Sequence, residues 1–459
     1  MQGVKGFFSR NGVEVYSSAT QFNFSGSRRI EFSRNSSLPM HRDSNLLSDA
    51  SLKSRQNRFR ASLNVQDNSL RHEFFSLFCA NLNDVLDSSM NLFAHRETES
   101  LVHGGPSQKV VGVLGGGQLG RMLCEAASQL AIKVIVLDPM ENCPASSICE
   151  YHMVGSYDDP LTVEEFAKRC GVLTVEIEHV DAETLERLEQ QGVDCQPKAS
   201  TIRIIQDKYK QKVHFFQNDI PLPKFMEIID FESAKKAGKL FGYPLMIKSK
   251  KLAYDGRGNA VAKSEDEITT AVHVLGGYSR GLYVEQWAQF VKELAVIVSR
   301  GRDGDLVCYT VVETIHRENI CHIVKSPASV SSKIRKLATD VACKAVSSLE
   351  GAGVFAVELF LTADDQVLLN EVAPRPHNSG HHTIESCFTS QFEQHLRAVV
   401  GLPLGDASMK TPASVMYNIL GEMEGEQGFV LANRLIGRAL QIPGASVHWY
   451  DKPGTFSSL

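Results

Sequence analysis

The chain lacks any apolar run that approaches the roughly 20 residues needed to span a bilayer, so we expect no membrane segment and no membrane partner. It has ten cysteines but no CxxC pair and no regular cysteine spacing, which argues against a zinc site or a disulfide framework and favours a reducing compartment. The absence of a GxxxxGK[ST] motif excludes a P-loop nucleotide site. A net charge of only −5 gives no reason to expect nucleic-acid binding.

The N-terminal region differs in composition from the rest of the chain. Residues 1–60 contain ten Lys or Arg, four Asp or Glu and twelve Ser. A segment rich in serine and arginine and poor in acids is typical of an organelle transit peptide, and the serine content favours a plastid over a mitochondrion. A merely disordered tail is the alternative. We expect residues 1–105 to be a transit peptide and disordered extension, and the protein to work in the chloroplast stroma.

From Lys109 the pattern changes to alternating strands and helices. Apolar runs at 109–114, 133–138 and 171–180 indicate buried strands with helices between them. This alternation predicts a doubly wound α/β domain over residues 106–205, whose ligands should lie at the carboxyl ends of the strands. One long charged helix is predicted over 199–219, ahead of a domain junction at two prolines, Pro221 and Pro223.

Beyond this junction the strands are typical of an antiparallel sheet. Segments 243–250 and 259–264 flank a glycine-rich loop, and segments 282–290 and 293–301 are predicted to pair with each other. We therefore predict an α+β domain with a mixed or antiparallel sheet over residues 206–400.

A predicted β-hairpin carries two glutamates. Val354–Leu361 and Gln366–Val372 are apolar runs separated by a polar TADD turn. If the turn centres on residues 364 and 365, Glu358 lies opposite Glu371 at roughly 5 Å, and two like charges at that spacing destabilise a hairpin unless a cation lies between them. Mg²⁺ is suited to such a pair. A solvated hairpin with an accidental acid pair is the alternative. Basic and amide side chains follow at Arg375, His377, Asn378, His381 and His382.

Three glycines, Gly115, Gly117 and Gly120, form GxGxxG between a strand and a helix, and Asp138 ends the next strand. This spacing is the dinucleotide fingerprint, in which the helix N-terminus binds phosphate and the acid binds a ribose hydroxyl. The same glycines also serve helix packing or bind other phosphates.

A second glycine-rich loop follows Lys248 and contains Tyr254-Asp255-Gly256-Arg257-Gly258-Asn259. Its backbone N–H groups and Arg257 could cover a polyphosphate. An ordinary type I′ hairpin at Asp255-Gly256 is the alternative. Lys208, Glu285 and Glu293 are weak signals taken singly, because most charged side chains are simply solvated.

Together, the segments GGGQLGRML, AYDGRGN and NEVAPRPHNSGH make the chain resemble the ATP-grasp superfamily from about Val110 to Asp451. Within it, the resemblance is strongest to the N5-carboxyaminoimidazole ribonucleotide synthetases, the ATP-dependent half of phosphoribosylaminoimidazole carboxylase in purine biosynthesis. The resemblance implies a pre-ATP-grasp domain that helps to hold a ribonucleotide and does not bind a dinucleotide. An ATP-grasp domain then follows.

The resemblance also assigns residues to ligands. It implies that ATP lies between two lobes and that Glu358 and Glu371 bind Mg²⁺. The implied ATP contacts are Lys208, Lys248, the loop Ala253, Tyr254, Asp255, Gly256, Arg257, Gly258 and Asn259, the hinge Glu285, Gln286, Trp287 and Ala288, and Glu293, His316, Asn370 and Glu371. The implied ribonucleotide contacts are Gly117, Gln118, Leu119, Glu176, Glu178 and Tyr254.

The reaction implied is activation of bicarbonate by the γ-phosphate of ATP to carboxyphosphate, followed by carboxyl transfer to the amine of 5-aminoimidazole ribonucleotide. Arg257, Arg375 and His377 would bind bicarbonate and spread the developing charge, while Tyr254 and Glu178 would act on the aminoimidazole side. The resemblance further implies a homodimer.

The C-terminal part departs from the family pattern. Residues 401–459 hold strand-like segments such as 413–420 and 446–450, and after Lys452-Pro453 the basic ending of the family does not follow. We therefore expect a small, incomplete β-rich C-terminal piece. Two further hypotheses stay open: a catalytically impaired, truncated isoform that binds ATP and pairs with the full-length enzyme, and an NAD(P)-dependent oxidoreductase based on GxGxxG.

Overall fold

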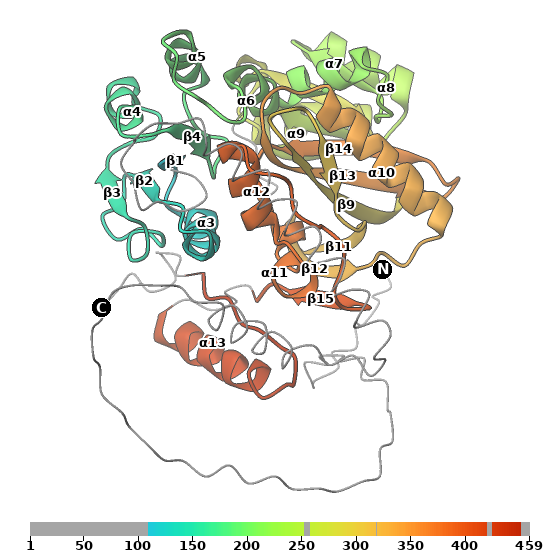
Figure 1. The fold of residues 1–459 in the computed structure, drawn as a ribbon. Coiled ribbons are helices and arrows are strands. Elements are labelled where there is room, and N and C mark those ends of the chain that lie inside the picture. The colour runs from blue at the N-terminus through green and yellow to red at the C-terminus, as the bar shows by residue number, and fades with distance from the viewer. Residues whose placement is uncertain (1–108, 252–257, 318, 420–424, 451–459) are drawn as a thin grey trace, which may run out of the picture. The chain divides into compact units, whose positions relative to one another are not determined.

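The computed structural model describes residues 109–251, 258–317, 319–419 and 425–450. Its first sheet is entirely parallel, in the order β3-β2-β1-β4. Helix α3 covers one face and α4 to α6 cover the other, so the predicted doubly wound α/β domain is confirmed (Figure 1). The elements are β1 (Val111–Leu114), α3 (Gln118–Gln129), β2 (Val134–Asp138), β3 (Tyr151–Val154), α4 (Pro160–Ala167), β4 (Val172–Val175), α5 (Ala182–Gln190) and α6 (Ala199–Gln206).

The second sheet is small and antiparallel, in the order β5-β8-β6-β7. Helices α8 and α9 pack their alanine and isoleucine side chains on one of its faces. The elements are α7 (Lys208–Gln217), β5 (Phe225–Ile228), α8 (Phe231–Phe241), β6 (Leu245–Ser249), β7 (Asn259–Ala262), η1 (Glu265–Glu267), α9 (Ile268–Val274), η2 (Tyr278–Arg280) and β8 (Leu282–Gln286).

The third sheet is larger, with the order β14-β13-β9-β11-β12-β15 and β10 beside β9, and all its pairs are antiparallel. Its elements are β9 (Phe290–Arg300), β10 (Leu306–Cys308), β11 (Val312–Arg317), β12 (Ile320–Ser326), α10 (Ser332–Ser347), β13 (Gly353–Thr362), β14 (Val367–Ala373), η3 (Asn378–Gly380), α11 (Thr383–Ser386), α12 (Gln391–Val400), β15 (Ser414–Tyr417) and α13 (Gly425–Ala439). The predicted α+β module with antiparallel sheets is therefore confirmed.

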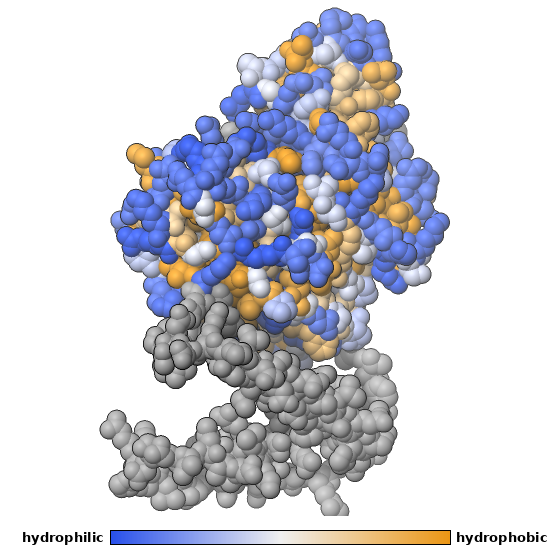
Figure 2. All heavy atoms as spheres, turned by 45° about the horizontal axis from the view of Figure 1, so that its top comes forward, coloured by the Kyte–Doolittle hydropathy of each residue, from blue (hydrophilic) through white to orange (hydrophobic). Residues whose placement is uncertain are grey.

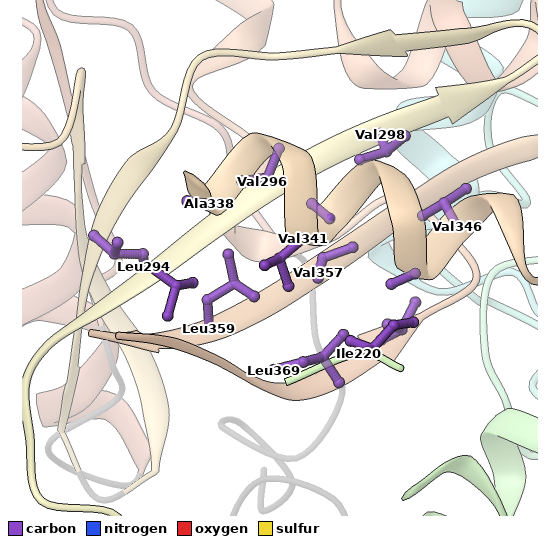
Figure 3. Packing of buried hydrophobic residues seen from close by; sticks show 14 of the residues in the cluster. Ile220, Leu294, Val296, Val298, Ala338, Val341, Val346, Val357, Leu359 and Leu369 are labelled. Atoms are coloured by element: carbon purple, nitrogen blue, oxygen red, sulfur yellow. The ribbon is translucent and has the colours of Figure 1, made fainter. Parts of the chain in front are cut away.

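The main hydrophobic core lies between α10 and this large sheet. Val341 and Val346 of α10 face Val296, Val357 and Leu359 of the strands (Figure 3). Alternate residues of β13 point into this core, so Glu358, which lies between two of them, faces the opposite side of the sheet. On the face shown in Figure 2, hydrophobic side chains occur in small groups among hydrophilic ones. Among the described helices, none combines the length and apolar character needed to cross a membrane.

The predicted pairing of 282–290 with 293–301 is wrong. Leu282–Gln286 is β8 of the small sheet, whereas Phe290–Arg300 is β9 of the large sheet. The segment Trp287-Ala288-Gln289 between them has none of the Gly, Asn or Asp residues that a tight hairpin turn requires, so the chain crosses from one sheet to the other. The crossing makes this segment the connection between two lobes.

The single helix predicted over 199–219 is also wrong, because it breaks at Asp207. This residue has an extended backbone, and its side chain accepts hydrogen bonds from the N–H groups of Tyr209 and Lys210. Aspartate is a strong N-cap, so it starts a new helix inside an otherwise helical pattern. The break sets the direction of α7 and of Lys208, its first residue. Residues 446–450, expected to be strand-like, belong to no strand.

A buried histidine connects the first domain to the large sheet. His395 of α12 accepts a hydrogen bond at Nδ1 from the Val354 N–H (3.1 Å), and its Nε2 lies 2.9 Å from Thr174 Oγ1 at the end of β4. Burial lowers the pKa of His395 to about 3, so the ring is neutral and Nε2 carries the proton that Thr174 accepts. The Asp194 carboxylate adds a second connection, paired with the Arg302 guanidinium at 2.7 and 3.0 Å.

Replacing a core residue beside Glu358 tests this packing. Leu359→Ala, at a position that is 1% exposed, should lower the free energy of unfolding by about 2–5 kcal/mol, because it leaves a cavity under α10. Leu240→Ala in α8, at a position that is 59% exposed, is the matched control and should change it by no more than about 0.5 kcal/mol. Urea unfolding followed by circular dichroism gives both values. Equal effects would contradict the proposed core.

Candidate active site

The two hairpin glutamates face each other, as the sequence predicts. Glu358 of β13 is the direct partner of Glu371 of β14. The predicted turn is nevertheless off by half a residue: Leu359 pairs with Leu369 and Leu361 with Val367, which centres the turn on Asp364 alone. A β-bulge between the two registers corrects the offset and brings the carboxylates opposite each other.

The extra residue of this bulge is Asn370, which has no partner on β13. Val367 and Leu369 point into the core, and the next core residue is Val372, three positions later. Without the bulge Glu371 would point into the core and Asn370 would face Glu358. The bulge therefore turns Glu371 towards Glu358.

Mutual repulsion shapes the electrostatics of the pair. Burial and the neighbouring Glu371 carboxylate raise the pKa of Glu358 to about 7. Burial would also raise the pKa of Glu371, but the Lys208 ammonium, 2.7 Å from its Oε2, holds it at about 2. Below about pH 7 the pair thus keeps one proton.

The donor set fits Mg²⁺ that is completed by phosphate oxygens. Both groups are carboxylates on one face of the sheet, and Mg²⁺ in phosphate sites uses one or two such ligands. Within the described ranges, no group of three or more His, Cys, Asp or Glu side chains could hold a metal alone. A bound polyphosphate would have to supply the remaining ligands.

Three lysines lie near these acids. Lys208 contacts Glu371. Lys248 and Lys212 share Glu285: the Lys248 ammonium lies 3.2 Å from Oε2, and the Lys212 ammonium lies 3.3 Å from Oε1. Burial would raise the pKa of Glu285, but the two lysines lower it. The Tyr283 hydroxyl also donates to Glu285 (3.1 Å). This buried cluster ties β8 and β6 of the small sheet to α7.

A histidine–carboxylate pair lies on the other side of Glu358. His316 Nδ1 lies 2.9 Å from Glu293 Oε2. Burial would lower the pKa of His316, but the hydrogen bond to Glu293 and the charge of Glu358 raise it. The pair therefore shifts this imidazole towards its protonated form.

These groups line one cavity of about 200 Å³. The small sheet contributes one wall and the large sheet the other, so the cavity lies between the two sheets. The lining residues are Lys208, Gln211, Lys212, Lys248, Ser249, Asn259, Tyr283, Glu293, His316, Asn319, Cys321, Glu358, Asn370, Glu371, His377 and Asn378.

The GxGxxG turn is already filled by acids of the chain itself. Glu176 accepts hydrogen bonds from the N–H groups of Gly117 and Gly120 at the N-terminus of α3. Asp138 accepts from the Gly116 N–H (2.8 Å) and the Met140 N–H (2.9 Å). The groups that would bind a pyrophosphate and a ribose are thus engaged within the protein, which argues against the oxidoreductase hypothesis.

A second polar region lies beyond β4, next to this turn. Arg375 pairs with Glu178 at 3.0 Å, and its charge also reaches Glu176. Gln118 Oε1, Arg375 Nε and His381 Nε2 are among the eight buried side-chain atoms of the described residues that have no hydrogen-bond partner. Unpartnered buried donors and acceptors are costly, so they indicate a polar ligand.

Some predicted residues are placed differently from the prediction. The side chain of Leu119 packs against the hydrophobic cluster of α3 and α12. Burial and Arg375 lower the pKa of His377 to about 4, so this ring is neutral and adds a hydrogen bond rather than the positive charge expected of it. Gln286, Trp287 and Ala288 do not line the cavity.

Of the predicted loop, Gly258 and Asn259 are described, and Asn259 lines the cavity. Ala253, Tyr254, Asp255, Gly256 and Arg257 lie outside the described residues. The sequence analysis missed Lys212, Gln211 and Tyr283. The spacing of Lys212, four positions after Lys208 on one helix, was the available signal, because such residues share a helix face.

Three protein families together match most of the described chain. Residues 108–206 match the ribonucleotide synthetase pre-ATP-grasp domain, residues 213–392 match the ATP-grasp domain, and residues 414–455 match the phosphoribosylaminoimidazole carboxylase C-terminal domain.

Individual proteins are similar over the same region. A chloroplastic phosphoribosylaminoimidazole carboxylase of Vigna aconitifolia is 72% identical over 344 residues, which are 75% of this chain and 61% of that protein. An N5-carboxyaminoimidazole ribonucleotide synthase of Synechococcus elongatus is 34% identical, over 74% of this chain and 85% of that protein. The crystal structure of N5-carboxyaminoimidazole synthase from Aspergillus clavatus with ADP and 5-aminoimidazole ribonucleotide matches with a TM-score of 0.70 at 43% identity, over 75% of this chain and 90% of that one. The chain thus spans about three fifths of the length of the plant relative.

The shared proton of the glutamate pair makes Mg²⁺ binding pH-dependent. Because the pKa of Glu358 is about 7, Mg²⁺ must displace a proton below that pH, and its apparent affinity should fall nearly tenfold between about pH 6.5 and pH 5.5 while levelling off above about pH 8. Calorimetric titration in two buffers of different ionisation enthalpy should show close to one proton released per Mg²⁺ at about pH 6. Glu358→Gln should abolish this release. No proton release by the unaltered protein would contradict the shared-proton account.

Proposed function

Because the chain belongs to the ATP-grasp family of N5-carboxyaminoimidazole ribonucleotide synthases, we propose that it uses ATP to carboxylate 5-aminoimidazole ribonucleotide with bicarbonate. In this reaction bicarbonate attacks the γ-phosphorus of ATP, which forms carboxyphosphate and ADP. The amine of the ribonucleotide then attacks the carboxyl carbon, which gives the carboxyamino product and phosphate. The step belongs to purine biosynthesis.

The facing pair Glu358 and Glu371 is the observation that carries the proposal. Two partly buried carboxylates opposite each other are unfavourable alone, and a Mg²⁺–triphosphate would relieve the repulsion while using the adjacent ammonium groups of Lys208 and Lys248. When bound, Mg²⁺ would neutralise charge on the transferred phosphoryl group. A dinucleotide oxidoreductase leaves this cluster without a role.

The proposed nucleotide site uses both lobes. Lys208 and Lys248 would donate to phosphate oxygens, since each contacts one carboxylate in the described part of the chain and has further N–H groups to donate. The hinge from Glu285 to Ala288 would hold the adenine, and Glu293 with its partner His316 would hold the ribose. The loop Ala253–Asn259, Asn370 and Glu371 complete the proposed set.

The acceptor site would lie between the two domains. Arg375 would bind bicarbonate and stabilise charge as carboxyphosphate forms, with neutral His377 as a hydrogen-bond partner. Glu178 is placed by Arg375 and would orient the amine. Gln118, with its unpartnered carbonyl oxygen, would contact the ribonucleotide. Arg257 and Tyr254 would join from the loop, and the remaining proposed contacts are Gly117, Leu119 and Glu176, of which the last also holds the turn.

The cellular setting follows from the relatives and the N-terminal sequence. The serine- and arginine-rich segment 1–60 and the chloroplastic plant relative favour action in the plastid. A homodimer remains part of the proposal.

ADP release by the purified full chain tests the proposal. It should require Mg²⁺ and bicarbonate and increase with added 5-aminoimidazole ribonucleotide. Glu371→Gln should reduce it by about 10²-fold or more, because the variant loses a Mg²⁺ ligand that acts on the transferred phosphoryl group. Glu232→Gln, on the exposed face of α8, is the matched control and should leave the rate unchanged.

Different failures have different meanings. If added 5-aminoimidazole ribonucleotide leaves the rate of ADP release unchanged, the ribonucleotide is not the carboxyl acceptor. Tight Mg²⁺–nucleotide binding without turnover would replace the proposal with the non-catalytic isoform. A Glu371→Gln variant as active as the unaltered protein would remove the metal assignment.

A further inference from the structure

The backbone N–H and carbonyl groups on the outer edge of β14 hydrogen-bond to side chains of α7 and to the Pro221 carbonyl, and not to another described strand. Gln211 of α7 accepts from the Val372 N–H (3.0 Å) and donates to the Val372 carbonyl (3.2 Å), and the Leu369 N–H donates to the Pro221 carbonyl (2.8 Å). Lys212, next to Gln211, donates to the Asn370 carbonyl at 2.7 Å and lies 3.5 Å from that of Leu369. Helix α7 thus holds β14 at the bulge.

The contacts of Lys212 account for all three of its N–H groups. They are directed at two backbone carbonyls of the bulge and at Glu285 Oε1, 3.3 Å away. The side chains of Lys212 and Glu285 are both only 3% exposed. Although Lys212 borders the nucleotide cavity, it keeps no donor for a phosphate, unlike Lys208 and Lys248.

We propose that Lys212 is a positioning residue that holds the β-bulge at Asn370 and thereby keeps Glu371 on the ligand face, opposite Glu358. The carbonyl groups of Leu369 and Asn370, at the bulge, both lie within hydrogen-bond distance of this buried ammonium group. Its third bond, to Glu285, links the metal-binding hairpin to the strand that leads into the hinge. Lys212 therefore connects the two ends of the nucleotide site without contacting the nucleotide.

Burial and the nearby Lys248 lower the pKa of Lys212 to about 8 despite its bond to Glu285. A buried ammonium group with a lowered pKa is retained only where its contacts offset the desolvation cost. This observation supports a structural use of the charge at the bulge.

The inference rests on the proposed nucleotide site and is tested on Lys212→Met in the full chain. The readout is the dissociation constant of ADP without Mg²⁺ divided by that with Mg²⁺. Both constants are measured from the fluorescence of Trp287 or of a labelled nucleotide. If Lys212 acted only through its positive charge, its removal would strengthen Mg²⁺ binding, because a charge that repels Mg²⁺ is lost. Loss of the bulge should instead weaken the Mg²⁺ contribution by about 10–100-fold, the usual cost of removing a residue that orients a metal ligand.

A second readout does not need the metal. In nucleotide-free protein, the amide hydrogens of Glu371 and Val372 should exchange faster in Lys212→Met than in the unaltered chain, because the edge of β14 loses its support. Lys210→Met is the matched control, since Lys210 lies on the same helix and is exposed; it should change neither readout.

If Lys212→Met fails to fold, the double variant Lys212→Met/Glu285→Gln, which removes both charges of this ion pair, replaces it and is compared with Glu285→Gln, since Lys248 loses its carboxylate partner equally in both. If Mg²⁺ leaves the dissociation constant of ADP unchanged in the unaltered protein, so that the ratio is near one, the proposed metal site itself is overturned. A large ratio that Lys212→Met leaves unchanged would overturn only this inference. Equal weakening of ADP binding with and without Mg²⁺ would also overturn it, because it would identify Lys212 as a direct nucleotide contact.

Discussion

The electrostatic repulsion between Glu358 and Glu371 is the constraint on which the rest of the site depends. Lys208 neutralises one carboxylate, and a proton remains on the other below about pH 7, which together relieve the repulsion. In the proposed site, Mg²⁺ with its phosphates would replace that proton. A cation shared by both carboxylates would remove their repulsion, which accounts for an otherwise unfavourable contact at this position.

The arrangement of the two sheets follows from how the chain crosses between them. Leu282–Gln286 ends in the small sheet and Phe290–Arg300 begins in the large one, so the segment between them connects the two sheets. Glu285 lies at the end of the first strand and Glu293 near the start of the second. A nucleotide that contacts both would bring the lobes together, and the buried contacts of Lys212 with Glu285 and with the Asn370 carbonyl already connect them.

The sequence predicted the features that depend on local patterns. Apolar periodicity predicted the parallel sheet, and counting from the turn predicted that Glu358 faces Glu371. The count succeeded only because the bulge at Asn370 compensates for a turn centred on Asp364, and a bulge held by a distant helix leaves no local signal. Asp207 was missed as a helix start because its cap competes with strong helical periodicity on both sides.

The most direct test of the account is a crystal structure with ADP and Mn²⁺, in which anomalous scattering locates the metal. The account predicts a peak within about 2–2.5 Å of carboxylate oxygens of both Glu358 and Glu371, with ADP phosphates completing the ligands beside Lys208 and Lys248. A nucleotide bound instead at the GGGQLG turn, or a metal remote from the glutamate pair, would contradict it.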